Sequence, residues 1–205
     1  MIPIRAFWCV GIIAVAVGLS TGCGSTARGP YSPNATAEQR NIPEGERLFQ
    51  KAMTIIEKDG VETEKLLNEA LTADLYHGPA HNNLGVLLLK KGKLYEAANE
   101  FTWAGKLLSG HPDPRVNLAM ALEQGGKSQD AIASCKTALE IQPGYLPAIQ
   151  TAALIQAHNG IASDDQVANL STIIERSSDP IWRDWAMKQR LAINMRETDH
   201  GSFHP

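Results

Sequence analysis

Cysteine is scarce in this chain of 205 residues, and the few that occur exclude a disulfide framework. Cys9 and Cys23 lie in or directly after an apolar N-terminal run, and Cys135 lies far along the chain. A disulfide framework needs an even set of cysteines at workable spacing, and no such set is present. We expect Cys135 to be a buried thiol that packs as a small apolar side chain.

An excess of basic residues is also missing. The chain has 19 Lys and Arg against 22 Asp and Glu, and without the N-terminal Arg5 the balance is 18 against 22. Proteins that bind nucleic acids usually present a basic face. The charge balance therefore argues against nucleic acid as a partner and leaves protein partners open.

The sequence also lacks a recognisable catalytic constellation. No Ser/His/Asp or Cys/His arrangement stands out, and no paired carboxylates share one face of an expected cleft. We therefore predict no enzyme activity, no cofactor and no metal site. His77, His81 and His111 lie close in sequence, so a metal-dependent activity there is kept as the weakest alternative, because metal ligation needs several side chains to converge.

The one long apolar run lies at the N-terminus, where residues 1–22 have the parts of an export signal. Arg5 supplies positive charge, and residues 6–19 are uncharged and rich in Ala, Val and Ile. Small residues then end the run directly before Cys23. This ending resembles the lipobox of bacterial lipoproteins, which implies that Cys23 is lipidated and anchors the chain to a membrane of the bacterial cell envelope.

Two other fates of this leader stay open. Cleavage could follow the small residues at 25–27, or the uncharged run from 6 to 26 could be retained as a membrane anchor. Gly24 follows the cysteine. By resemblance to Gram-negative lipoproteins, this residue favours the outer membrane, with the chain facing the periplasm.

Residues 23–43 contain several Gly and Pro and almost no large apolar side chains. Such a segment cannot bury enough apolar surface to offset the entropy lost on ordering. We expect a flexible tether that holds a folded domain away from the membrane.

The centre of the chain holds two copies of one pattern at a constant offset. Self-similarity at a fixed period indicates a repeat architecture. The matched residues are Leu84 and Leu118, Gly85 and Ala119, Gly92 and Gly126, Ala97 and Ala131, Phe101 and Cys135, and Ala104 and Ala138.

Apolar residues at helical spacing extend this pattern in both directions. The outer units are less regular, because Gly60 lies two residues past the expected turn, and Asp165 and Asn169 replace small and apolar residues. Irregular end units are common in repeat arrays. The expected units are helix hairpins at 44–77, 78–111, 112–145 and 146–177, a closing helix at 178–196 and a disordered tail at 197–205.

These residues make the chain resemble the tetratricopeptide repeat family. That family has Leu-Gly early in the first helix of each hairpin, which matches Leu84-Gly85, and later Gly, Ala, aromatic and Ala positions. Gly85 lets the paired helices approach closely, and Phe101 fills the space beside them. His81 stands where the family has Trp. The resemblance implies an all-α solenoid of about four hairpins plus a C-terminal closing helix.

By the same resemblance, the first helix of each hairpin lines a concave groove. A mixture of amide, apolar and acidic side chains there suits an extended or helical peptide with apolar anchors. Val86 and Met120 stand where a chaperone-type carboxylate clamp needs Asn, so no such clamp is expected. Each apolar groove residue could instead pack against the neighbouring repeat. The groove positions are Asn82, Val86, Leu89, Lys90, Asp113, Val116, Met120, Glu123, Gln124, Gln150, Leu154, Ala157 and His158.

The sequence thus favours a membrane-tethered adaptor for an unidentified protein or peptide partner. Comparable tetratricopeptide lipoproteins assist assembly of pili, secretion machines or cell-wall enzymes. The main alternative is a structural envelope lipoprotein that associates with itself. Trp182 and Trp185 belong either to the core of the closing helix or to an exposed docking patch.

Overall fold

The computed structural model describes residues 40–161 and 163–201, and this part of the chain is built from α-helices. The predicted all-α class is confirmed. The signal peptide, Cys23 and most of the predicted tether lie outside the described residues. The helices are α1 (Ile42–Ile55), α2 (Gly60–Ala73), α3 (Gly78–Lys90), α4 (Leu94–Leu107), α5 (Asp113–Gln124), α6 (Ser128–Ile141), α7 (Leu146–Asn159), α8 (Asp164–Arg176) and α9 (Pro180–Gly201).

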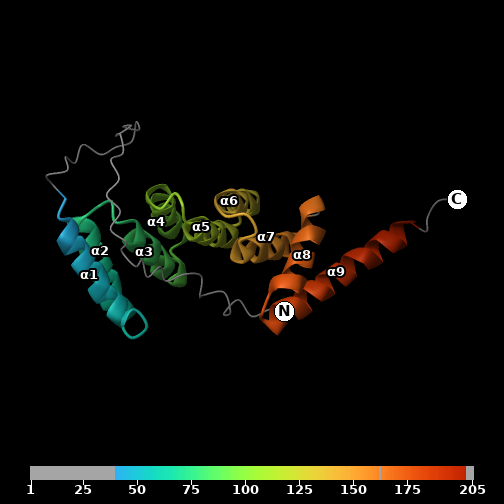
Figure 1. Ribbon diagram of the computed structural model, residues 1–205, viewed down its shortest axis with the longest axis horizontal. Helices are drawn as coiled ribbons and strands as arrows, with labels where there is room; N and C mark the ends of the chain where they lie inside the picture. Colours follow the sequence, from blue (N-terminus) through green and yellow to red (C-terminus); the bar gives the residue numbers. More distant parts are fainter. Residues whose placement is uncertain (1–39, 162, 202–205) are drawn as a thin grey trace.

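Consecutive helices pair into hairpins that follow one another along the long axis of the molecule (Figure 1). The hairpins are α1–α2, α3–α4, α5–α6 and α7–α8, and α9 packs on α8 at the end. In addition, α3 contacts α5, and α5 contacts α7. The first helices α3, α5 and α7 therefore form one layer of the predicted solenoid.

Three hairpin turns repeat the same glycine geometry at the repeat period. Gly92, Gly126 and Gly160 have φ of 73°, 74° and 62°, a region that glycine adopts without steric cost. In the first of these turns, the Lys93 amide donates to the Leu88 carbonyl at 3.0 Å. This bond is the mark of a Schellman helix ending, and equivalent bonds occur in the other two turns.

The turn of the first hairpin has a different structure. Gly60 is the first residue of α2, and Asp59 caps that helix. The Asp59 carboxylate accepts hydrogen bonds from the amides of Val61 and Glu62, both at 3.0 Å. A side-chain cap therefore replaces the glycine turn, which explains why Gly60 is out of register.

Small residues bring the helices of the middle hairpins together. A Cβ atom on Gly85 would lie 2.7 Å from the ring of Phe101, which is fully buried. Gly85 therefore permits the close approach of α3 to α4 that the sequence predicted. In the α5–α6 hairpin, the equivalent Ala119 and Cys135 are both buried. The smaller partner at 135 leaves room for the methyl group at 119.

The fourth hairpin buries a different face of its second helix. Asp165 is exposed and Asn169 is half-buried in slots that are core positions in α6. Leu170 and Ile173 form the buried face of α8 instead, and both are 0% exposed. Val167 is 39% exposed. The core side of α8 is thus rotated from the repeat register.

The closing helix begins at Pro180, shortly after the expected start at 178, and it ends later than expected. The Asp179 carboxylate accepts a hydrogen bond from the Ile181 amide at 2.9 Å, which caps α9. The helix continues to Gly201, so residues 197–201 are helical where a disordered tail was expected. Similarly, α1 begins at Ile42, inside the expected tether.

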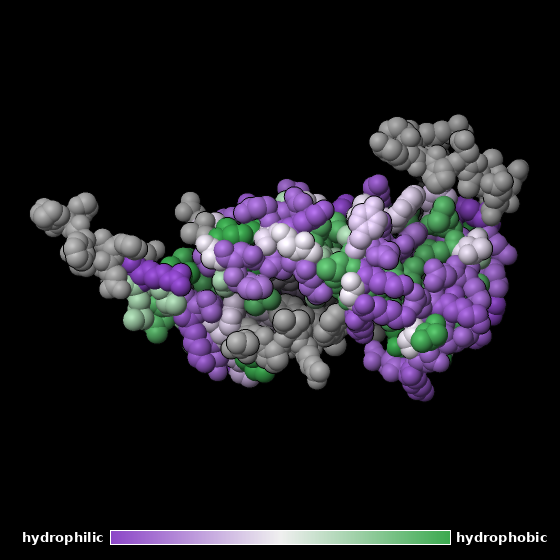
Figure 2. Space-filling model, turned by 180° about the vertical axis from the view of Figure 1, so that it is seen from behind, coloured by the Kyte–Doolittle hydropathy of each residue, from purple (hydrophilic) through white to green (hydrophobic). Residues whose placement is uncertain are grey.

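Most of the surface seen in Figure 2 is hydrophilic, with smaller hydrophobic patches between the polar side chains. Most of the large apolar side chains lie in clusters between the helices. Within 40–161 and 163–201, no helix is both long enough and apolar enough to cross a membrane.

Candidate functional site

The first helices α3, α5 and α7 carry the predicted groove residues in rows of equivalent repeat positions. Because α3 contacts α5 and α5 contacts α7, equivalent positions are neighbours across this layer. The rows are Asn82, Val116 and Gln150; Val86, Met120 and Leu154; Leu89, Glu123 and Ala157; and Lys90, Gln124 and His158.

Three of the predicted groove residues are buried. Asn82 and Val116 are 0% exposed, and Leu89 is 4% exposed. Val116 packs with Ala138 and Ala148 of the following helices, and Leu89 belongs to the largest apolar cluster. The prediction that these three line an open groove is therefore wrong, because their positions face the core and the next hairpin.

A second row remains accessible. Val86, Met120 and Leu154 are each half-buried, one on each of α3, α5 and α7. Val86 and Met120 pack against the largest apolar cluster from its edge. These three residues, called the apolar row below, present part of their apolar surface to solvent. Partly exposed apolar side chains of this kind can receive the anchor residues of a bound peptide.

Polar residues border the apolar row toward the C-terminal ends of the helices. Lys90, Gln124 and His158 lie at equivalent positions there, and Gln124 is exposed. Gln150 is half-buried at the opposite end of its helix, and Ala157 is half-buried beside His158. The margin of the candidate site therefore mixes cationic, amide and imidazole groups.

Buried amides connect the first helices beneath the surface. The Asn117 amide donates to Asn82 Oδ1 at 3.0 Å, and the Asn82 amide donates to Asn83 Oδ1 at 3.3 Å. Asn83 in turn donates to Met53 Sδ at 3.0 Å. Buried polar groups with partners fix the relative positions of the helices. Asn82 is thus a brace between α3 and α5 instead of a ligand contact.

Glu123 connects α5 to α7. Its Oε1 accepts a hydrogen bond from Asn159 Nδ2 at 2.8 Å and lies 3.2 Å from His158 Nδ1. Its side chain is 16% exposed, whereas that of His158 is 77% exposed. The second oxygen, Oε2, is buried and has no hydrogen-bond partner in the described part of the chain. Such an acceptor favours a donor supplied by a bound molecule.

Asp113 is already engaged within the protein. Its carboxylate accepts a hydrogen bond from the hydroxyl of Tyr145, which lies in the connection between α6 and α7. Burial and this bond to the carboxylate raise the pKa of Tyr145 well above its ordinary value. The hydroxyl therefore stays protonated and donates to Asp113. This hydrogen bond links two hairpins, so the Asp113 carboxylate already has a partner within the protein.

Sequence reasoning missed Asn117, Asn159 and Tyr145. Asn117 lies one position after the groove row of Val116, and Asn159 lies one position after His158. Polar residues next to predicted groove positions on the first helices were the available signal. Their roles depend on helix rotation, which the repeat pattern alone does not specify.

The structure does not bring together the three histidines of the alternative metal-site hypothesis. His77 Nε2 lies 3.0 Å from Glu46 Oε2, and its Nδ1 accepts a hydrogen bond from the Ala80 amide. This bond caps α3. His111 is exposed on the surface. Among the described residues, no three His, Cys, Asp or Glu side chains gather as metal ligands would.

His81 fills the place of the family's Trp as a buried structural residue. Its ring is 3% exposed and stacks on Trp103 with 5.7 Å between centroids. Nδ1 lies 2.6 Å from Glu100 Oε2, and Nε2 lies 2.8 Å from the Leu75 carbonyl oxygen. His81 therefore ties the α2–α3 connection to α4.

The prediction for Cys135 is confirmed. The residue is 0% exposed and is a free thiol. Burial raises the pKa of this thiol to about 12. The thiol therefore stays protonated, and a protonated buried thiol is neither a good nucleophile nor a metal ligand.

Trp182 and Trp185 pack inward from α9. Both are half-buried against the cluster that contains Ile149, Leu170 and Ile173. The two indole rings meet edge to face, with 5.4 Å between centroids. This packing favours the core reading over the docking patch.

Solved structures with the same arrangement of helices are tetratricopeptide (TPR) proteins. The crystal structure of TTC0263, described as a thermophilic TPR protein in Thermus thermophilus, matches with a TM-score of 0.59 and 17% identity, over 73% of this chain and 82% of that chain. This chain has the tetratricopeptide fold.

Two further tetratricopeptide structures are described with a peptide-binding site or with a bound peptide. YrrB, "a TPR protein with an unusual peptide-binding site", matches at TM-score 0.57 and 17% identity over 69% of this chain and 71% of YrrB. The first TPR of Spaghetti (RPAP3), bound to an HSP90 peptide, matches at TM-score 0.56 and 15% identity over 60% of this chain and 98% of that one. No protein-family model and no curated protein sequence matches this chain.

Proposed function

We propose that this tetratricopeptide chain is a non-catalytic adaptor that binds a segment of a partner protein across α3, α5 and α7. The observation that carries the proposal is the apolar row next to the buried, unpartnered Oε2 of Glu123. A peptide supplies apolar side chains for the row and backbone N–H donors for the carboxylate. It therefore matches both features at once.

The braces beneath the groove support this proposal. The amides of Asn82 and Asn117 and the contact between Glu123 and Asn159 hold successive first helices together without a ligand. A surface that is ordered before binding loses little entropy when a partner docks. YrrB and RPAP3, which share the fold, are described with a peptide-binding site and with a bound peptide.

The test is selection of binding peptides from a displayed random library, followed by affinity measurements on two matched variants. Met120→Glu places a charge in the apolar row. Tyr95→Glu places the same charge on α4, where Tyr95 is 77% exposed. We expect Met120→Glu to weaken selected peptides by about tenfold or more, with Tyr95→Glu unchanged. Equal affinities of both variants for every selected peptide would contradict the proposal.

We further propose that the adaptor is tethered to the bacterial envelope through Cys23 and serves the assembly of an envelope complex at the outer membrane, on its periplasmic side. The sequence of residues 1–43 supports this, since an export signal, a lipobox-like cysteine and a Gly/Pro-rich segment follow in that order. Cys23→Ser should move the chain from the membrane fraction to the soluble fraction. A mature N-terminus without acyl chains on Cys23 would contradict the tether.

Self-association is the second candidate function. Met187 and Leu191 lie one helical turn apart on α9 and are 49% and 61% exposed. Exposed apolar side chains on one helix face can pair two copies of a chain. Light scattering over a concentration series separates the candidates. A constant monomer mass at all concentrations excludes self-assembly. A mass that rises with concentration in the wild type, but stays at the monomer value in Leu191→Glu, supports it.

A further inference from the structure

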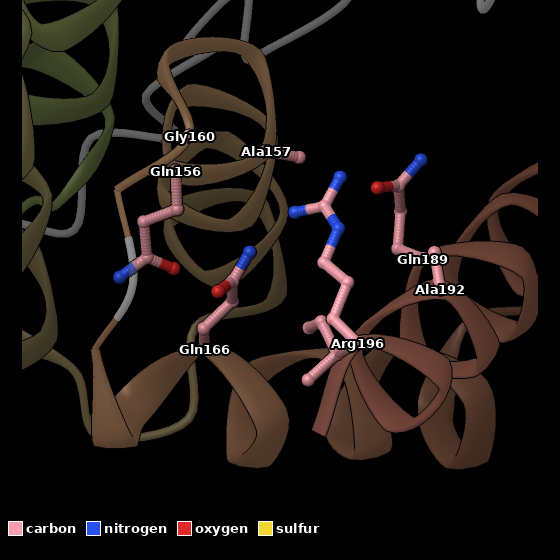
Figure 3. A pocket seen from close by; sticks show the side chains of 8 residues that line it. Gln156, Ala157, Gly160, Gln166, Gln189, Ala192 and Arg196 are labelled. Carbon is pink, nitrogen blue, oxygen red and sulfur yellow. The ribbon is translucent and has the colours of Figure 1, made fainter. Parts of the chain in front are cut away.

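The C-terminal end of the stack contains a cavity beside the closing helix. Whereas α3 contacts α5 and α5 contacts α7, α9 packs on α8. A cavity of about 240 Å³ lies between the C-terminal end of α7, the start of α8 and the later turns of α9 (Figure 3). Its polar lining comes from Gln156, Gln166, Gln189 and Arg196.

Gln156 is the buried polar residue of this cavity. Its side chain is 3% exposed, and its Nε2 donates to Ser163 Oγ at 2.8 Å. Its Oε1 is buried without a hydrogen-bond partner among the described residues. Figure 3 shows this carbonyl directed toward Gln166. A buried amide with one unpaired end costs free energy, which a ligand can recover.

The orientation of the Gln156 amide does not change what the ligand must offer. The Ser163 hydroxyl can donate or accept, so either end of the amide can face it. The cavity then receives either a carbonyl oxygen or an N–H group from Gln156. A ligand that contains an amide group has both a donor and an acceptor and satisfies either orientation.

Arg196 adds a cation to these amides. Figure 3 shows its guanidinium group, and the amides of Gln166 and Gln189, projecting into the same space. Among the described residues that border the cavity there is no acidic side chain. A guanidinium group binds a carboxylate through two parallel hydrogen bonds, so an anionic group of that shape is the complement.

We propose that this cavity binds an acylamino carboxylate, the group formed by the C-terminal residue of a peptide or by a free N-acyl amino acid. The carboxylate pairs with Arg196, and the acyl amide pairs with Gln156 and its glutamine neighbours. The volume is below the roughly 300–1,000 Å³ of sites for drug-sized ligands. It suits about one residue of the ligand.

This site is distinct from the apolar row, although Ala157 of the groove margin also lines the cavity. Its charged and amide groups lie on α7, α8 and α9, whereas the apolar row spans α3, α5 and α7. The two proposals therefore fail independently. Loss of groove binding in Met120→Glu leaves the cavity intact, and loss of the cavity leaves the apolar row intact.

The test is an NMR titration of the full chain with four probes: N-acetylalanine, acetyl-tetraalanine and the C-terminal amide of each. We expect both carboxylates to shift the side-chain amide signals of Gln156 and Gln189, with Kd on the order of 1 mM for so few atoms. A free N-acyl amino acid is the source if the two bind alike, and a chain end is the source if the longer one binds more tightly. Both amides should bind about tenfold more weakly or not at all.

Arg196→Gln should weaken the carboxylates by about tenfold. Arg190→Gln is the matched control, since Arg190 is on the same helix but contacts Ser171 at 3.4 Å, outside the cavity. Gln156→Leu, checked for retained helicity by circular dichroism, should also abolish the shift of the Gln189 side-chain amide. Equal binding of carboxylate and amide probes, or an unchanged Kd in Arg196→Gln, overturns the proposal.

Discussion

The middle hairpins keep the repeat register, whereas the C-terminal end departs from it in α8, and the cores of the two regions are packed differently. In α3–α4, Gly85 faces the ring of Phe101, and in α5–α6, Ala119 faces Cys135. In both hairpins the sizes of the two residues are complementary: glycine faces the large ring, and alanine faces the smaller thiol. In α8, Asn169 occupies the partner's position, and the buried face is rotated. Beyond this helix, α9 packs on α8, and the polar cavity lies between the end of α7, the start of α8 and the later turns of α9. The size pairing thus accompanies close packing in the middle hairpins, and the separate site lies where α9 closes the stack.

Truncation of the central aromatic residue should have the largest effect. Phe101→Ala removes a ring that is 0% exposed and is expected to cost about 3–5 kcal/mol of unfolding free energy. At the C-terminal end, Val167→Ala should stay within about 0.5 kcal/mol, since that side chain is 39% exposed. Urea denaturation followed by circular dichroism measures both. A similar loss in the two variants would show that the two regions do not differ in packing as described.

The size pairing of the middle hairpins can be broken and then restored. Gly85→Ala should cost about 1–3 kcal/mol, because the added methyl group meets the ring of Phe101. Adding Phe101→Cys recreates the pair found at 119 and 135. We expect the double variant to be more stable than the sum of the single effects predicts. Additive losses in a double-mutant cycle on the urea midpoints would refute the pairing argument.

Charge, as well as packing, secures the N-terminal end. Arg40 donates to both carboxylate oxygens of Asp74, at 2.7 and 3.0 Å, and the Tyr76 amide donates to one of them. Burial alone would raise the pKa of Asp74, but these hydrogen bonds outweigh it and hold the pKa below its ordinary value. The ionised carboxylate is therefore the form that stabilises the fold.

Replacement of this carboxylate should have the smallest effect and should depend on pH. Asp74→Asn is expected to cost about 1–2 kcal/mol near pH 7. Since the folded pKa is depressed, the contribution is complete above the unfolded pKa of about 4 and is lost as pH falls through the folded value. The stability difference between wild type and variant should therefore shrink below about pH 4. A difference that stays constant as the pH is lowered from neutral to well below the unfolded pKa would contradict the role of the ionised pair.

The repeat pattern predicted the turns and the close packing because these depend on local backbone needs. Gly92 and Gly126 must take positive φ, and Gly85 must lack a side chain, and both requirements are visible as residue types at fixed spacing. The groove was predicted less well. Asn82 and Val116 are buried because the stacking of one hairpin on the next covers them, and stacking geometry is not written in a single repeat.

The cavity at the C-terminal end could not be predicted for a related reason. Gln156 lies far from Gln189 and Arg196 in the sequence, and it meets them because α9 packs on α8. No periodic signal connects them, since α9 lies outside the repeat register. The glutamines on α7, α8 and α9 were the one available signal.

The most direct test of the central claim is the site at which a bound peptide crosslinks. A photoreactive phenylalanine analogue would replace Met120 in the apolar row or, as the control, the exposed Tyr95 on α4. Mass spectrometry after irradiation with a selected peptide would then locate the adduct. The proposed adaptor function predicts a crosslink from position 120 and none from position 95. Crosslinking from position 95 alone would contradict it.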